Sequence, residues 1–247
     1  MTIRIHFYKN IALCFATEHQ SNMHAHQALQ ITVGLDGDFD LELEENGSRS
    51  IQRVGFACIA PQQKHKITTK NNPLAYLFAD TGPVAFSTWK KNGGIAKPPD
   101  AAILDDLRRL IALPEQQPQE AHALAHRWYG HTLPGLIEIR PSDPRIARAL
   151  DFIDADPLKN LNYSDLAALV HLSASRFASL FREQTGLPVR NYVLWRRLIY
   201  VFERLEHGDS ITTAAHNAGF SDCAHLSRSF PEIYGSKPSE IKMARIG

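Results

Sequence analysis

The chain contains little cysteine, no long apolar run and almost no net charge. Its 247 residues include three cysteines, Cys14, Cys58 and Cys223, which lie far apart and form no CxxC pair. An odd, scattered set predicts neither a disulfide framework nor a cysteine zinc cluster, and it favours a reducing compartment. No run is long enough to span a membrane, and the apolar stretch 11–16 is too short for a signal-peptide core. The formal net charge of +1 identifies no acidic partner by itself. We therefore expect a globular, cytoplasmic protein with no membrane role.

The first third of the sequence has short apolar or alternating runs separated by turn residues. In the run 39–45, Phe39, Leu41 and Leu43 alternate with acidic residues, which is typical of a half-exposed strand. The same reasoning predicts strands at 3–8, 29–35, 39–45, 56–60 and 74–79. Many short strands with hairpin turns indicate a sandwich or a small barrel.

The pattern becomes helical after a break at 90–100. Apolar residues from 103 to 111 follow helical spacing behind Asp100, a candidate N-cap. This stripe either packs on the barrel or pairs with a second copy of the chain through Leu107, Leu110 and Ile111. A second helix is predicted at 118–129. The stretch 130–142, which contains glycine and proline, is the best linker candidate.

The sequence after Asp143 reads as helical and contains a degenerate internal repeat. Three residues of the first copy recur 49 positions later, where Phe177, Phe181 and Gly186 match Leu226, Phe230 and Gly235. Each copy reads as a short helix, a tight turn and a longer helix, which is a helix-turn-helix arrangement. The turn carries Gly219 in the second copy and His171 in the first, and histidine tolerates a positive φ better than most residues.

A longer helix, predicted at about 190–207, connects the two copies. It carries an apolar stripe that we expect to bind the copies together, formed by Tyr192, Trp195, Leu198, Ile199, Phe202 and Leu205. Between Arg176 and Arg204 there are six arginines and two acidic residues, as expected for a domain with one basic face.

The last helix of the second copy leaves a polar face opposite its apolar stripe. Arg228 on this face is the residue type that bonds guanine bidentately, and its small neighbours permit close approach to base edges. Two such helices about one DNA turn apart would read successive major grooves. A protein-binding module fits the same periodicity, so the pattern alone leaves both interpretations open.

The C-terminal region also resembles a known family. The segments "LAALVHLSASRFASLFREQTGLPVRNYVLWRRL" and "ITTAAHNAGFSDCAHLSRSFPEIYGSKPSEIK" are similar to the DNA-binding domain of AraC/XylS-type bacterial transcription regulators. The residues that fit the family pattern in the second segment are Ile211, Ala215, Gly219, Phe220, Arg228, Phe230, Gly235 and Pro238. The resemblance covers roughly residues 143–247. Two departures are Leu226, where phenylalanine is usual, and Arg204, where leucine is common.

The resemblance implies two helix-turn-helix units joined by a long helix, with a DNA-reading helix in each. In the first unit the implied reading residues are Ala174, Ser175, Ala178 and Ser179. In the second unit they are Cys223, Ala224, His225, Ser227 and Arg228. The implied phosphate contacts are Arg176, Arg196, Arg197 and Lys237. Because the first reading face holds only alanine and serine, we expect it to rely on methyl contacts, water or DNA shape.

The N-terminal histidines have a spacing of their own. His24, His26, Gln30 and Gly37 follow the pattern HxH-x3-Q-x6-G, and His65 follows on a later strand. This resembles the two cupin motifs, with Gln30 where an acid is usual. We expect His24, His26, Gln30 and His65 to line a pocket for a small organic effector, with no resident cofactor. The alternative is a metal ion held by the three histidines.

Together these features predict an α+β protein with three parts. Residues 1–95 form a cupin-like β-barrel that senses an effector, 96–142 form a helical linker or dimerisation segment, and 143–247 form an all-α domain with two helix-turn-helix units. We expect a ligand-responsive regulator, an activator rather than an enzyme, that binds double-stranded promoter DNA. Its other expected partners are RNA polymerase and a second copy of the chain. The alternative is a metal-dependent cupin enzyme with an appended helical domain.

Overall fold

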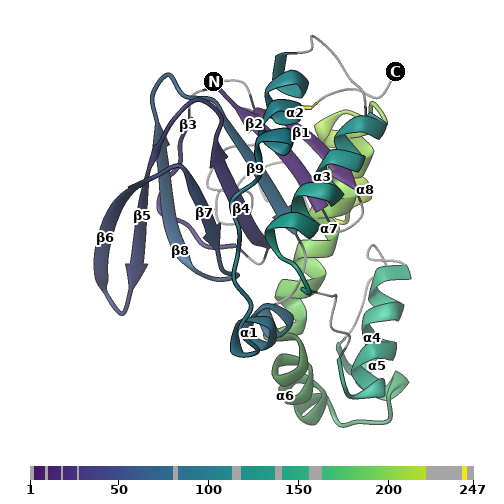
Figure 1. Ribbon diagram of the computed structural model, residues 1–247. Helices are drawn as coiled ribbons and strands as arrows, with labels where there is room; N and C mark the ends of the chain where they lie inside the picture. The colour runs from purple at the N-terminus through teal and green to yellow at the C-terminus, as the bar shows by residue number, and fades with distance from the viewer. Residues whose placement is uncertain are drawn as a thin grey trace.

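The computed structural model of the protein describes residues 3–8, 11–17, 19–26, 28–79, 83–112, 118–136, 141–155, 163–220 and 241–243. Within these residues, a two-sheet N-terminal domain is followed by a helical C-terminal domain (Figure 1). The helical domain packs directly against the sheets. The predicted α+β architecture is therefore confirmed.

The N-terminal domain consists of two sheets. The six-stranded sheet has the order β10-β1-β2-β9-β4-β7, and the four-stranded sheet has the order β3-β8-β5-β6. The first sheet is built from β1 (Ile3–Tyr8), β2 (Ile11–Ala16), β4 (Leu29–Gly34), β7 (Phe56–Ile59), β9 (Leu74–Ala79) and β10 (Ile241–Met243). The second is built from β3 (His19–Gln20), β5 (Phe39–Glu45), β6 (Ser48–Val54) and β8 (Lys64–Thr69). The described strands thus form two separate sheets, and their pairings do not close into the β-barrel expected from the sequence.

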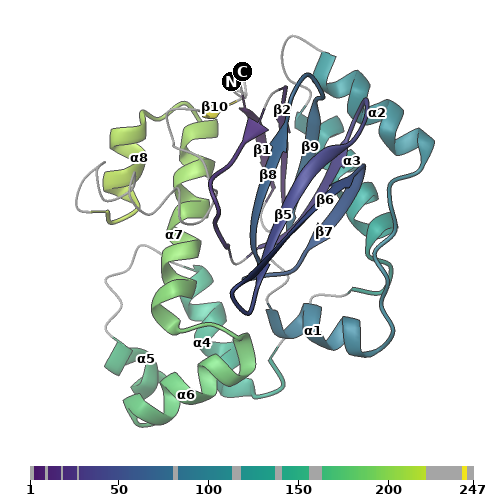
Figure 2. The ribbon, with the colours of Figure 1, turned by 90° about the vertical axis from the view of Figure 1, so that its left-hand side faces the viewer.

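Strand β2 explains how both faces of the larger sheet are buried. All six of its residues are buried, and large and small side chains alternate along it. Ile11, Leu13 and Phe15 belong to a core shared with helices α2 and α3. Ala12, Cys14 and Ala16 belong to a core shared with helices α7 and α8. Figure 2 shows these two helix pairs on opposite sides of the strands.

The helices of 96–142 are part of the N-terminal domain. Helix α2 (Ala101–Ala112) and helix α3 (Pro118–Thr132) cover the outer face of the six-stranded sheet, beside helix α1 (Pro83–Lys91). Leu107 and Leu110 are buried in this core at 0% and 5% exposure, and Ile111 packs against it. Because Leu107 and Leu110 are covered within the same chain, the stripe packs on the sheet and cannot also pair across a dimer.

The C-terminal domain contains helices α4 (Pro144–Ala155), α5 (Tyr163–Leu169), α6 (Ala174–Thr185), α7 (Val189–Glu206) and α8 (Ile211–Asn217). Strand β10 corrects the expectation of a purely helical domain, because Ile241–Met243 pairs in parallel with Ile3–Ile5 at the edge of the N-terminal sheet. Both ends of the described chain therefore meet in one sheet. Among the described helices, we find none with the length and apolarity needed to cross a bilayer.

Candidate nucleic-acid interface and sensor site

The first helix-turn-helix unit is formed by α5, a tight turn and α6. His171 takes a φ of 56° in this turn, as predicted, and the turn closes with a 2.9 Å hydrogen bond from Leu172 N–H to the Ala167 carbonyl. Ser173 caps α6, because its hydroxyl accepts from the Arg176 N–H, and Gly186 ends the helix with a φ of 77°. The turn and both caps thus set where the helix begins and ends.

The turn supplies a matched pair of stability predictions. His171 is exposed and adopts a left-handed backbone conformation that is strained for a residue with a Cβ. His171→Gly is therefore expected to raise the free energy of unfolding by up to about 1 kcal/mol. Gly219 holds the equivalent position in the second turn at φ 74°, so Gly219→Ala is expected to lower the free energy of unfolding by about 1–2 kcal/mol. Urea unfolding of the two variants beside the parent measures both effects. Equal shifts of the same sign would contradict the equivalence of the two turns.

Helix α6 buries one stripe and exposes the opposite face. Phe177, Leu180 and Phe181 are buried in a core with residues of α4, α5 and α7. The predicted DNA-facing residues of this helix are all exposed: Ala174, Ser175, Arg176, Ala178 and Ser179. The helix therefore presents its predicted reading face to solvent, and the DNA role of these residues remains a prediction.

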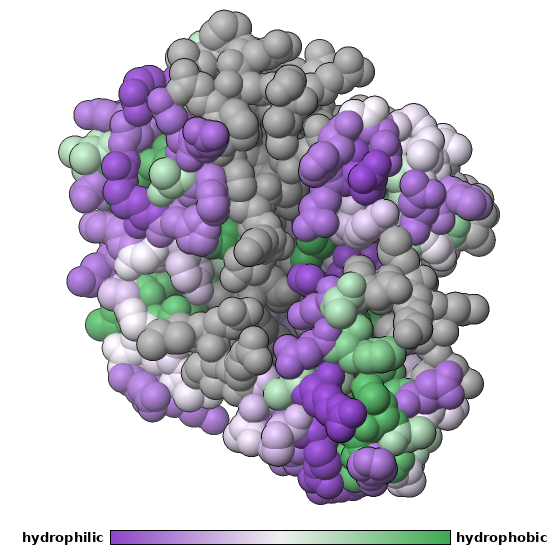
Figure 3. Space-filling view, turned by 90° about the vertical axis from the view of Figure 1, so that its right-hand side faces the viewer, coloured by the Kyte–Doolittle hydropathy of each residue, from purple (hydrophilic) through white to green (hydrophobic). Residues whose placement is uncertain are grey.

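A groove of about 810 Å³ lies beside this reading face. Its lining includes Ala174, Ala178 and Ser179 together with Arg182 and Arg190, two exposed arginines that sequence reasoning did not single out. The helical spacing of Arg182 from Ala178 could have placed it there. Figure 3 shows hydrophobic residues at the surface among hydrophilic ones in the lower right lobe, where α4, α5 and α6 lie.

The predicted phosphate contacts on α7 lie in less open surroundings. Arg196 is 21% exposed, and its Nε lies 2.8 Å from Asp154 Oδ1 on α4. The Tyr192 hydroxyl donates to the same carboxylate at 3.0 Å. Burial raises the pKa of the Asp154 carboxyl. Arg197 lies next to the second turn, because a Cβ on Gly219 would meet its guanidinium carbon at 3.5 Å. Arg196 thus fastens α7 to α4, and a phosphate would have to compete with that ion pair.

The second unit is described only as far as its turn. The Ser210 hydroxyl caps α8 by accepting from the Thr213 N–H, and Ala214, Ala215 and Phe220 are buried. Arg204, a departure from the family pattern, pairs through its Nε with Asp209 Oδ2 at 2.7 Å just before this unit. The remaining predicted DNA contacts lie outside the described residues: Cys223, Ala224, His225, Ser227, Arg228 and Lys237.

The stripe of α7 corrects one expectation from the sequence. Trp195, Leu198, Ile199 and Phe202 are buried as predicted, and Tyr192 and Leu205 are half-buried, but the stripe does not serve only to bind the two units together. Leu198, Val201 and Phe202 share a core with the inner faces of both sheets, and α8 joins the same core. Trp195 and Ile199 pack with Ala28 and Phe78 of the N-terminal domain. The long helix therefore joins the helical domain to both N-terminal sheets.

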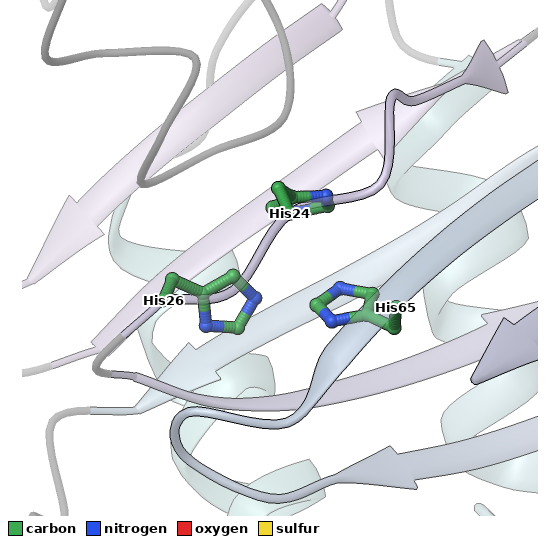
Figure 4. Close-up of side chains that lie close together, drawn as sticks. All are labelled: His24, His26 and His65. Atoms are coloured by element: carbon green, nitrogen blue, oxygen red, sulfur yellow. The ribbon is translucent and has the colours of Figure 1, made fainter. Parts of the chain in front are cut away.

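The sensor site gathers the four residues predicted to line a pocket. His24 and His65 exchange backbone hydrogen bonds of 3.0 and 2.9 Å, which hold their ring centroids 4.3 Å apart. Figure 4 shows the rings of His24, His26 and His65 gathered, two from the segment before β4 and one from β8. His26 Nε2 lies 2.8 Å and His65 Nε2 3.2 Å from the side-chain oxygen of Gln30.

The ring nitrogens on the other side are held by the backbone. The Nδ1 atoms of His24, His26 and His65 lie 2.8, 2.8 and 2.9 Å from the carbonyl oxygens of residues 22, 28 and 63. Burial lowers the pKa of His26 to about 4, with the nearby His24 adding to the shift, and burial also lowers the pKa of His24. Both rings are therefore neutral near pH 7.

Sequence reasoning missed two neighbours of this cluster. The Gln30 amide contacts the Thr32 hydroxyl at 2.9 Å, and the ring of His26 packs edge-on to Phe78 with centroids 5.3 Å apart. Thr32 could have been found, because it lies two residues along the same strand and so on the same face as Gln30. Phe78 could not, because its contact depends on how β9 pairs with β4.

Comparison with known proteins finds a helix-turn-helix domain in the C-terminal part of the chain. Residues 166–244 match a family described as "Helix-turn-helix domain". The regulatory protein PocR of Salmonella typhimurium is 33% identical over 103 residues, covering 41% of this chain and 34% of PocR. The probable transcriptional regulator LumQ of Photobacterium leiognathi is 24% identical over 228 residues, covering 89% of this chain and 91% of LumQ. The chain therefore spans about a third of PocR and nearly all of LumQ.

A solved structure has a similar two-domain fold. Apo ToxT from Vibrio cholerae aligns with a TM-score of 0.57 at 10% identity, covering 94% of this chain and 96% of ToxT. At that identity the likeness shows the fold alone. The fold and the family match together define a two-domain chain, with a sheet-rich N-terminal domain and a helix-turn-helix domain within residues 166–244. In its C-terminal part the chain is also similar to a putative AraC-like transcription regulator of Streptomyces antibioticus, at 26% identity over 102 residues that cover 41% of this chain and 34% of the relative.

Proposed function

We propose that this protein is an effector-responsive, sequence-specific regulator that activates promoters in the bacterial cytoplasm and catalyses no reaction. The single observation that carries the proposal is helix α7, which joins the two helix-turn-helix units and buries its stripe in the sensor core. A change in the sensor can reach the DNA-binding units through this one rigid element. Similarity to RhaS of Enterobacter, a relative described as an HTH-type transcriptional activator, supports activation over repression.

On DNA, the two reading helices would enter successive major grooves on one face of the duplex. The exposed face of α6 supplies small side chains, so methyl contacts and DNA shape would contribute most of its sequence preference. Exposed Arg176, Arg182 and Arg190 would neutralise phosphates and fix the register of the domain. The stronger base contact falls to the second unit, where Arg228 is the proposed guanine reader.

In the sensor, an effector that binds at the site of His24, His26, Gln30 and His65 would act by shifting the position of α7. An effector can shift such an equilibrium only by binding one arrangement more tightly than the other. One ToxT structure, with a TM-score of 0.53, is described as bound to an unsaturated fatty acid, which supports effector binding in a fold of this kind.

RNA polymerase and a second copy of the chain complete the proposed set of partners. Activation requires a contact that recruits or positions polymerase at the promoter. A dimer would have to use a surface other than Leu107 and Leu110, because both are buried within the chain. The alternative is a metal-dependent cupin enzyme. It would require that the N-terminal domain turns over a substrate, and DNA binding alone would not account for such turnover.

Substitution of the proposed guanine reader tests this function. Arg228→Ala is expected to reduce specific DNA affinity by about 1–3 kcal/mol and to relax preference at one position. Fluorescence anisotropy on a duplex recovered from a random pool measures the loss. Arg53→Ala, on exposed β6 of the sensor domain, is the matched control that removes the same charge. Equal losses in the two variants would remove Arg228 from the reading face.

A further inference from the structure

The three sensor histidines are held in one tautomer by the backbone. A carbonyl oxygen only accepts, so each Nδ1 atom that faces a carbonyl must carry the ring proton. In a neutral imidazole the proton-free Nε2 is then a lone-pair donor. The same pattern, in which one ring nitrogen donates to a carbonyl, orients histidines that bind metal through the other nitrogen.

The Gln30 amide lies where two of these lone pairs point. Two unprotonated Nε2 atoms, on His26 and His65, face one end of the Gln30 amide at 2.8 and 3.2 Å. An amide oxygen at this end would place one hydrogen-bond acceptor against the two acceptor nitrogens. Turning the amide by 180° removes the conflict, since the nitrogen then donates to both rings and the oxygen accepts from the Thr32 hydroxyl. Gln30 thus lies where the lone pairs of His26 and His65 converge, so its amide must move aside for an ion to bind there.

We propose that His24, His26 and His65 bind a divalent first-row transition-metal ion and that this ion is the signal read by the DNA-binding domain. The three residues offer ligand atoms that all lie within 4.8 Å of one another. Zn–N bonds of about 2.0–2.1 Å place tetrahedral ligands roughly 3.3 Å apart, so the rings must close by at most about 1.5 Å. Three imidazoles leave a fourth position, which faces Gln30, and they match the preference of Zn²⁺ for nitrogen.

Movement of the three histidine rings towards an ion would act directly on α7. His26 is tied through its Nδ1–H to the carbonyl of Ala28, and its ring packs against Phe78. Ala28 and Phe78 in turn pack with Trp195 and Ile199 of α7. A ligand that moves His26 therefore moves the two contacts on which this part of α7 rests. This coupling rests on the proposed function, whereas the metal site stands on its own geometry.

Metal binding is tested with the full chain and with Zn²⁺ and Co²⁺ alone. The parent carries His122→Gln and His126→Gln, because the rings of these exposed residues of α3 lie edge to face with centroids 4.5 Å apart and would bind metal on the surface. After chelator treatment, calorimetry is expected to show uptake of about one Zn²⁺ per chain, and Co²⁺ is expected to give the visible spectrum of a tetrahedral nitrogen site. His24→Ala, at the least buried of the three histidines, should weaken binding at least about 10-fold. Absence of uptake by the parent, or unchanged affinity in His24→Ala, would overturn the site.

The coupling is measured separately by DNA anisotropy on a selected duplex. Saturating Zn²⁺ is expected to change the DNA dissociation constant of the parent at least about fivefold, and to leave that of His24→Ala unchanged. Phe78→Leu should keep Zn²⁺ binding and lose most of the response. Zn²⁺ uptake without any change in DNA affinity would overturn the ion as the signal while leaving the metal site in place. Loss of all specific DNA binding would instead refute the proposed function, with the metal result unaffected.

Discussion

Replacing Phe202 with alanine is expected to destabilise the sensor and DNA-binding domains together. Phe202 is 1% exposed and lies in the core that α7 shares with both sheets. Removing a buried phenylalanine side chain costs about 3–5 kcal/mol through lost transfer energy and the cavity left behind. Because the cavity would lie between the two domains, both domains should lose stability. Chemical unfolding followed by circular dichroism measures the change in free energy.

Hydrogen exchange distinguishes a loss of stability in both domains from a loss that is confined to the helical domain. Peptides that contain β2 should exchange faster in Phe202→Ala, although the substitution lies in the other domain, because β2 contributes Ala12, Cys14 and Ala16 to that core. Leu205→Ala, on the same helix but only partly buried, is the matched control and should have a smaller effect. Unchanged protection of β2 in Phe202→Ala would show that the domains are not coupled through α7.

A carboxylate on the reading face of α6 is expected to abolish specific DNA binding without unfolding the protein. Ala178 is exposed, so Ala178→Asp should change the free energy of unfolding by about 1 kcal/mol or less. Close to a phosphate backbone, the new charge should reduce DNA affinity by several kcal/mol through repulsion. Anisotropy and unfolding curves of the same preparation separate the two effects.

The control for this variant places the same charge far from the groove. Ile51 is 72% exposed on β6, and Ile51→Asp lowers the net charge by the same amount. It should reduce DNA affinity only slightly, because the long-range charge effect is screened by salt. Comparable losses in Ala178→Asp and Ile51→Asp would show that α6 does not approach DNA.

Several features followed from local patterns in the sequence. The alternation in 39–45 predicted β5, and the spacing of Ile103, Leu107 and Leu110 predicted α2. His171 was placed in a turn with positive φ by alignment of the two repeats, which depends only on local backbone geometry. The HxH spacing brought His24, His26 and Gln30 together, because these residues lie on one short segment leading into β4.

The sequence did not show which element each buried face packs against. An apolar stripe on α7 predicts burial, but the same stripe fits a partner helix, a second copy or a sheet. The signal that pointed to the sheet was the small residues of β2, Ala12, Cys14 and Ala16, and it has meaning only once the strand order is known. Strand β10 was missed because three residues carry no period.

The most direct test of a regulator with two reading helices is the DNA that the full-length protein selects from a random pool of duplexes. We predict enrichment of two short half-sites whose centres lie about 10–10.5 base pairs apart, bound with an affinity that falls steeply as salt rises. A pool with no enriched sequence, or binding that is indifferent to salt, would contradict the assignment.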